Sequence, residues 1–230
     1  MLLRHTIPLF ILFLSACSAT TPQSPTGNSA ESEIGYLAKS DIDTVADIHL
    51  YQIDQYLNEL AYKLYRLNPR HCKGGTPNIE RCVTRLFKKD YGVKLPSDKA
   101  IKNIELSLDT KFSGDRVAKF IWGLHSMIHS AYSYKTELFF FDELDPQKLY
   151  NSARNIEIAV WRLSNFRGEQ GQLLLITNSM EAGIANLSFE RLFGKLVATQ
   201  DTMAKIISES SRRRIKNIIQ QLATAVFLPI

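Results

Sequence analysis

Two histidines have the spacing of a metal-binding pair. His125 and His129 stand four positions apart in a segment of helical periodicity, so their side chains point to the same side of a helix. Zinc-binding H-E-x-x-H helices use this spacing, with a glutamate after the first histidine to activate water. Ser126 follows His125 here, so that general base is missing. The pair therefore predicts either a structural or transition-metal site completed by a distant carboxylate, or two histidines packed on aromatic side chains.

Two cysteines form a second chemical pair. Cys72 and Cys82 enclose a stretch that contains two glycines and Pro77, residues that let a chain turn sharply enough for the sulfurs to meet. We predict a disulfide, which would stabilise the fold by roughly 3 kcal/mol by restricting the unfolded chain. Two alternatives remain open, namely free thiols and a metal site that includes His71. The metal alternative lacks a fourth ligand and the usual two-residue spacing of the cysteines.

The beginning of the chain has the features of an export signal. Arg4 and His5 form a short basic segment, and residues 7–14 form an apolar run. The run is too short to span a bilayer as a stable helix but has the length of the apolar part of a signal peptide. We therefore expect residues 1–16 to be removed during export.

The sequence Leu14-Ser15-Ala16-Cys17 resembles the lipobox of bacterial lipoproteins. In that family a branched apolar residue and two small residues precede the cysteine that receives diacylglycerol. The resemblance implies that Cys17 is lipidated and becomes the first mature residue, the lipid being the membrane anchor. Ser18 stands where that family has aspartate for inner-membrane retention, which implies an outer-membrane anchor facing the periplasm. Lipidation also accounts for the odd cysteine count of three.

Composition separates a linker from a folded domain. Residues 17–33 consist mostly of small and polar residues that cannot bury a core, so they are expected to form a flexible linker. Residues 34–230 have an ordinary globular composition and suit a single helical domain. The net charge of +5 suggests acidic neighbours. In other compartments a pI near 9.0 would favour nucleic acid as a partner. Because we expect this chain in the periplasm, we predict no nucleic-acid partner.

Apolar residues recur at helical spacing through most of the domain. Ser40 with Asp41 suits the cap of the first segment, Asp145 suits the N-cap of another with Pro146 in its first turn, and Ser113-Gly114-Asp115 begins a third. The first and last helices are predicted to be long. The predicted helices cover residues 41–67, 78–89, 97–108, 113–134, 145–165 and 187–227, of which 97–108 also fits an extended segment.

Two short apolar runs interrupt this pattern. Residues 137–142 and 173–177 are consistent either with two small buried strands or with packed loops. Glycine and proline are scarce within the helical segments. The sequence therefore predicts an all-α, multi-helix bundle with long N- and C-terminal helices and at most one very small two-stranded sheet.

A group of cations lies in the last predicted helix. Arg212, Arg213, Arg214 and Lys216 cannot all face the core, because successive helical residues turn by about 100°. We expect a solvated basic collar. It either keeps the surface soluble or contacts anionic lipid headgroups, lipopolysaccharide phosphates or an acidic partner.

The chain lacks the short motifs of common enzymes, including G-x-S-x-G, S-x-x-K, G-x-G-x-x-G, C-x-x-C and the phosphate loop. We expect a non-enzymatic interaction module of the cell envelope, without a cofactor, that docks on an envelope protein. One alternative is an envelope hydrolase or metal-dependent enzyme in which His125 and His129 converge with Glu157 or Glu190. Another is a carrier of a small ligand between the helices.

Overall fold

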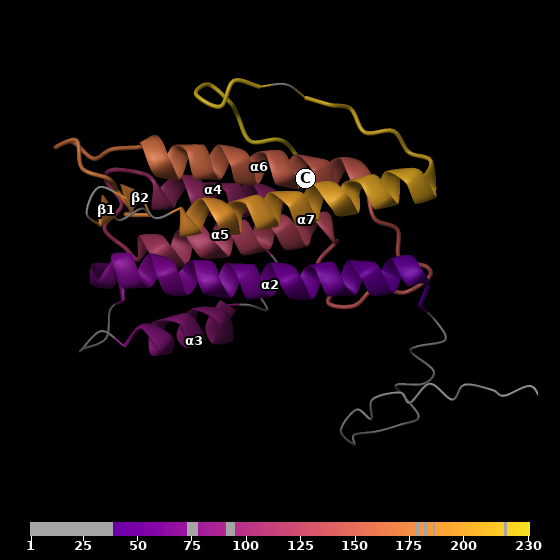
Figure 1. Ribbon diagram of the computed structural model, residues 1–230, viewed down its shortest axis with the longest axis horizontal. Coiled ribbons are helices and arrows are strands. Elements are labelled where there is room, and N and C mark those ends of the chain that lie inside the picture. Colours follow the sequence, from indigo (N-terminus) through magenta and orange to yellow (C-terminus); the bar gives the residue numbers. More distant parts are fainter. Residues whose placement is uncertain are drawn as a thin grey trace, which may run out of the picture. The chain divides into compact units, whose positions relative to one another are not determined.

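The helices of this protein pack side by side in an all-α bundle (Figure 1), which confirms the predicted fold class. The structure is a computed structural model that describes residues 39–72, 78–90, 95–177, 180–181, 184–185, 187–218 and 220–230. These residues belong to one compact unit, Ala38–Ile230. The helices are α2 (Asp41–Leu67), η1 (Pro69–His71), α3 (Ile79–Asp90), α4 (Ser97–Ser107), α5 (Arg116–Ala131), α6 (Pro146–Asn165) and α7 (Ser188–Ser211).

Local capping explains where three helices begin. The Ser40 side chain accepts a hydrogen bond from the Asp43 backbone, and the Asp43 carboxylate accepts one from the Ser40 backbone, which forms a reciprocal capping box. Asp115 and Asp145 accept backbone hydrogen bonds at the starts of α5 and α6. The caps at Ser40 and Asp145 were predicted, and Asp115 lies within the predicted start of α5 at residues 113–115, because capping depends on residues only two or three positions apart.

Helix α2 lies against three neighbours and exposes one side. It contacts α3, α5 and α7, while α4 packs along α5 and α6 along α7 (Figure 1). The apolar stripe of α2 is fully buried at Ile53, Leu57, Leu60 and Leu64. Because buried apolar side chains are the main source of folding free energy, this stripe sets the orientation of α2 toward the bundle.

Cys72 and Cys82 form the predicted disulfide, with their Cα atoms 5.8 Å apart. The bond joins the chain just after η1 to the first turns of α3. Residues 73–77, which include Pro77, lie outside the described residues. The disulfide holds α3 against α2, with Leu86 of α3 buried in the core.

Neither predicted strand segment forms a strand. In residues 137–142 the chain turns, with Leu138 and Leu144 buried on either side of the turn. Leu173, in the other segment, makes only an isolated bridge with Arg167. The described strands are instead β1 (Met180–Glu181) and β2 (Ile184–Ala185), an antiparallel pair of two residues each.

The last helix is shorter than predicted. Helix α7 ends at Ser211, and Arg212 adopts a left-handed conformation with a φ of 55°. The hydroxyls of Ser210 and Ser211 donate to the Ile207 carbonyl, at the point where the helix stops. The chain that follows runs back along α6 (Figure 1) and is held there by buried Asn155, which exchanges two hydrogen bonds with the Leu228 backbone. The prediction of a helix to residue 227 is therefore wrong. The apolar periodicity of this segment does not reveal that its backbone bonds to α6 instead of forming helix.

Candidate functional site

His125 and His129 meet a carboxylate from a different helix. Both histidines lie on α5, one helical turn apart, and Asp54 reaches them from α2. Asp54 directly follows buried Ile53 in α2. It therefore stands at the border of the apolar stripe, which turns it toward α5.

The two imidazoles converge on a single carboxylate oxygen. Asp54 Oδ1 lies 2.9 Å from His129 Nε2 and 3.7 Å from His125 Nε2. The two rings stack with centroids 4.0 Å apart and an angle of 27° between their planes. One potential ligand atom from each of the three residues lies within 4.8 Å of the others. We call Asp54, His125 and His129 the His–Asp cluster.

Burial determines the protonation of His125. Desolvation first, and then the charge of neighbouring His129, lowers the pKa of His125 from 6.5 to about 3, although Asp54 acts in the opposite direction. His125 is therefore neutral at neutral pH, which is the form of imidazole that binds a metal. His125 and His129 are 7% and 9% exposed, whereas the Asp54 side chain is 33% exposed. Solvent thus reaches the cluster on the side of Asp54.

The carboxylate that meets the two histidines is not one of the two that the sequence suggested. Among the described residues, the group close enough to share a metal contains Asp54 and neither Glu157 nor Glu190. Glu157 lies 3.3 Å from Arg154, which also binds Asp201 of α7 at 2.6 Å. Burial raises the pKa of Glu157, and Arg154 opposes that shift. Glu157 therefore belongs to an ion-pair network between α6 and α7, and the carboxylate that meets the two histidines is Asp54.

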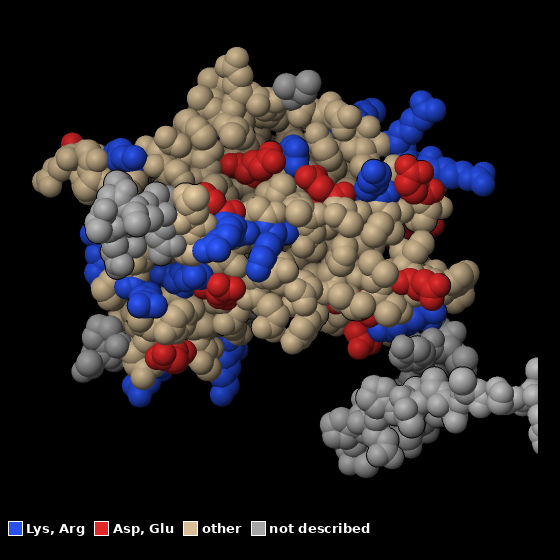
Figure 2. Space-filling view, in the orientation of Figure 1, with Lys and Arg blue, Asp and Glu red and all other residues tan. Residues whose placement is uncertain are grey.

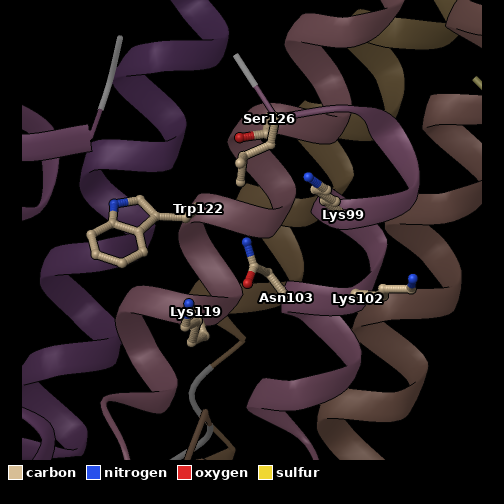
Figure 3. Close-up of a pocket in the computed structure, with 7 residues that line it drawn as sticks. Lys99, Lys102, Asn103, Lys119, Trp122 and Ser126 are labelled. Atoms are coloured by element: carbon tan, nitrogen blue, oxygen red, sulfur yellow. The ribbon is translucent and has the colours of Figure 1, made fainter. Parts of the chain in front are cut away.

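A basic pocket lies on a neighbouring face of α5. Figure 3 shows Lys99, Lys102 and Asn103 of α4 opposite Lys119, Trp122 and Ser126 of α5. These residues line a cavity of about 400 Å³. The Lys119 ammonium lies 5.8 Å from the centre of the Trp122 ring. Three ammonium groups favour an anionic neighbour, but Lys99 and Lys102 are exposed, so water and salt screen most of their charge.

Two aromatic side chains project from the end of the bundle at which α2 begins. In the connection between α5 and α6, Phe140 and Phe141 are 69% and 91% exposed. Their rings meet edge to face, with centroids 5.4 Å apart. The connection is held in place because buried Leu138 donates its backbone N–H to the Asp47 carboxylate of α2, at 2.8 Å. Exposed phenylalanines on an anchored loop are typical of a contact surface.

The predicted basic group lies beside these phenylalanines, although it is not helical. Arg212, Arg213, Arg214 and Lys216 follow the end of α7 and are all exposed. Lys and Arg side chains project at the end of the bundle where α7 ends (Figure 2). The prediction of a collar on a helix is wrong because α7 ends at Ser211.

One ion pair joins the two groups. Arg213 binds Glu143, at 2.8 Å, in the connection that carries the phenylalanines. A groove of about 460 Å³ adjoins the start of α2, this connection and the end of α7, with Ser40, Phe140 and Arg213 in its lining. We call Phe140, Phe141, Arg212, Arg213, Arg214 and Lys216 the tether-side surface, because α2 begins at this end and the predicted flexible linker of residues 17–33, here called the tether, precedes it in the sequence.

Cys17 and the predicted signal peptide lie outside the described residues. Within the part of the chain that the structure describes, no helix has the length and hydrophobicity needed to cross a membrane. No protein-family model, curated protein or solved structure matches this chain.

Proposed function

We propose that this protein is a lipid-anchored, non-enzymatic interaction module of the bacterial cell envelope. Cys17 carries the lipid, the anchor lies in the outer membrane, and the helical domain faces the periplasm. The domain docks through the tether-side surface. The observation that carries this proposal is that exposed Phe140 and Phe141 and the Arg212–Arg214 group lie at the end where the tether enters.

The proximity of tether and surface supports docking. A tether brings the domain to its partner at a high effective concentration, so a modest contact area is sufficient for recruitment. The rise in effective concentration is largest for a surface close to the tether, because the lipid anchor holds that surface nearest to the membrane. The tether-side surface begins next to Ser40, directly before α2.

The chemistry of the tether-side surface specifies its partner. Arg213 is paired with Glu143, whereas Arg212, Arg214 and Lys216 have no ion pair with another described residue. These cations suit an acidic surface, and the two phenylalanine rings suit an apolar pocket beside it. An acidic envelope protein is the expected partner, and anionic headgroups or lipopolysaccharide phosphates are the lipid counterpart.

A photocrosslinking amino acid at position 141 tests this proposal in intact cells. We expect crosslinked adducts, with fewer adducts after Arg212→Glu with Arg214→Glu, because reversed charges repel an acidic partner. Both arginines are exposed, so the free energy of unfolding should change by less than about 0.5 kcal/mol. The mass of the adduct distinguishes a protein from a lipid.

The matched control reverses two exposed cations away from this end, Arg81→Glu with Lys88→Glu on α3. These substitutions change the net charge equally and should leave the adducts unchanged. If both double variants reduce crosslinking equally, or if position 141 gives no more adduct than position 88, the tether-side surface is not the docking site.

A second candidate function is a metal-dependent envelope enzyme, which is favoured by the convergence of Asp54, His125 and His129. The two functions predict opposite orders of importance in a complementation assay. Docking predicts that the Arg212→Glu, Arg214→Glu variant fails while a folded His125→Gln, His129→Gln variant functions. The enzyme predicts the reverse, because loss of one ligand of a catalytic metal abolishes turnover.

A further inference from the structure

We propose that Asp54, His125 and His129 bind one divalent transition metal, with Zn²⁺ as the expected ion. This site is independent of lipidation and of docking through the tether-side surface. It joins α2 to α5 through three protein ligands, two imidazole nitrogens and one carboxylate oxygen.

The distances fit a shared ion. Zinc bonds to nitrogen and oxygen of about 2.0–2.1 Å place two ligands of a tetrahedral site roughly 3.3 Å apart. The two measured separations from Asp54 Oδ1, 2.9 Å to His129 Nε2 and 3.7 Å to His125 Nε2, lie on either side of that value. Shifts of a few tenths of an ångström in the side chains would therefore place all three ligands around one metal.

The donor types select the class of ion. Imidazole suits Zn²⁺, Cu²⁺, Ni²⁺ and Fe²⁺, whereas Ca²⁺ and Mg²⁺ favour six or more oxygen ligands. The cluster has two nitrogens and one described carboxylate, so a hard cation would gain little from it. Zinc accepts three protein ligands and a water in tetrahedral geometry.

The surroundings of the cluster provide both rigidity and access. Two successive turns of α5 fix the histidines, whose rings are almost fully buried. Asp54 is one-third exposed, so an ion can enter, and a water can take the fourth position, on that side. His129 Nε2 and Asp54 Oδ1 lie 2.9 Å apart, so both ligand atoms already border the space that the ion would occupy.

Metal binding would stabilise the bundle, because the unfolded chain lacks the assembled site. At a free Zn²⁺ concentration 100 times the dissociation constant, we expect the thermal midpoint of unfolding to rise by on the order of 5–10 °C. This shift reports on metal binding without any assay of enzyme activity.

The test uses the detergent-purified full-length chain, isolated through a histidine-free tag and treated with a chelator. Calorimetric titration with Zn²⁺ should give one ion per chain, and Co²⁺ should give the visible spectrum of a tetrahedral site. His129→Gln and Asp54→Asn should each weaken Zn²⁺ binding by at least about 100-fold, because each removes a ligand. Asp54→Asn preserves side-chain size, so it remains informative if His129→Gln does not fold.

The matched control is His49→Gln, which removes a half-buried histidine of α2 outside the cluster. It should bind Zn²⁺ with unchanged affinity and keep the rise in midpoint. The proposal is overturned if the folded wild-type chain binds no stoichiometric Zn²⁺, or if His129→Gln and Asp54→Asn bind as tightly as wild type. Binding of Cu²⁺ more tightly than Zn²⁺ would follow the usual order of metal affinities and would support the proposed site.

Discussion

Gly123 lies where α5 packs tightly on α4. A Cβ atom at this position would lie 2.5 Å from Ile104 Cγ1 and 2.8 Å from the Ala100 carbonyl oxygen. Since the carbonyl belongs to the backbone of α4, rotation of a side chain cannot relieve the clash. A glycine inside a helix costs about 1 kcal/mol relative to alanine, and here the close packing of two helices requires it.

We expect Gly123→Ala to lower the free energy of unfolding by about 1–3 kcal/mol, because the clash exceeds the gain in helix propensity. Urea denaturation measures the change. Gly194→Ala on α7 is the matched control, since nothing lies within 4 Å of its added Cβ. That variant should be more stable than wild type by up to about 1 kcal/mol. Equal effects of the two substitutions would mean that α4 and α5 are not in close contact.

At the scale of the element, the chain after α7 acts as a strap along α6. Asn155 is fully buried and bonds both the N–H and the carbonyl of Leu228, at 2.6 and 2.9 Å. Asn151 donates to the Pro229 carbonyl one turn earlier, and Arg162 donates to the Ala225 carbonyl. An extended segment has no backbone ladder of its own, so these side chains of α6 satisfy polar groups that burial would leave unpaired.

Asn155→Ala should therefore destabilise the protein by about 2–4 kcal/mol, because two buried backbone groups lose their partner. Protease should also cut residues 212–230 faster, as followed by mass spectrometry. The matched control, Asn165→Ala, removes an exposed side chain that bonds only the Trp161 carbonyl within its own helix. Its unfolding free energy should change by no more than about 0.5 kcal/mol. Wild-type cleavage in Asn155→Ala would show that the strap is held by other contacts.

At the scale of the whole molecule, the proposed lipid and the tether-side surface act together. Lipid attachment restricts the domain to the neighbourhood of one membrane, and the surface next to the tether then meets its partner without a long search. An interaction too weak to form between free molecules can thus become effective. The proposed function therefore depends on Cys17 as well as on Phe141 and Arg214.

Cys17→Ser should abolish labelling by a fatty-acid analogue and move the protein from the membrane fraction to the soluble fraction. The reason is that Cys17 is the residue whose thiol is expected to receive the lipid, and no described helix is able to span a membrane. Fractionation in high salt removes proteins held only by charge. A Cys17→Ser protein that remains in membranes under those conditions, or is still labelled, contradicts the proposed anchor.

The local sequence determined where the helices begin and how the cysteines pair. Ser40, Asp115 and Asp145 cap their helices through neighbours two or three residues away, and the pairing of Cys72 with Cys82 closes a short loop. Interactions over such short separations leave a pattern in the residues themselves. The same holds for the histidine pair, because a separation of four residues places two side chains on one face of a helix.

Only the tertiary structure decided what those faces meet. Asp54 joins histidines more than seventy positions away because the stripe that runs beside it, through Ile53, packs α2 on α5. In the sequence, Asp54 is marked only as an acidic residue next to an apolar stripe, and many surface residues have that position. The end of α7 was partly nonlocal, since no proline or glycine stops it and, besides the local bonds of Ser210 and Ser211, the following chain is bonded by Asn155 on another helix. Such partners depend on how helices orient in three dimensions, which apolar periodicity alone does not specify.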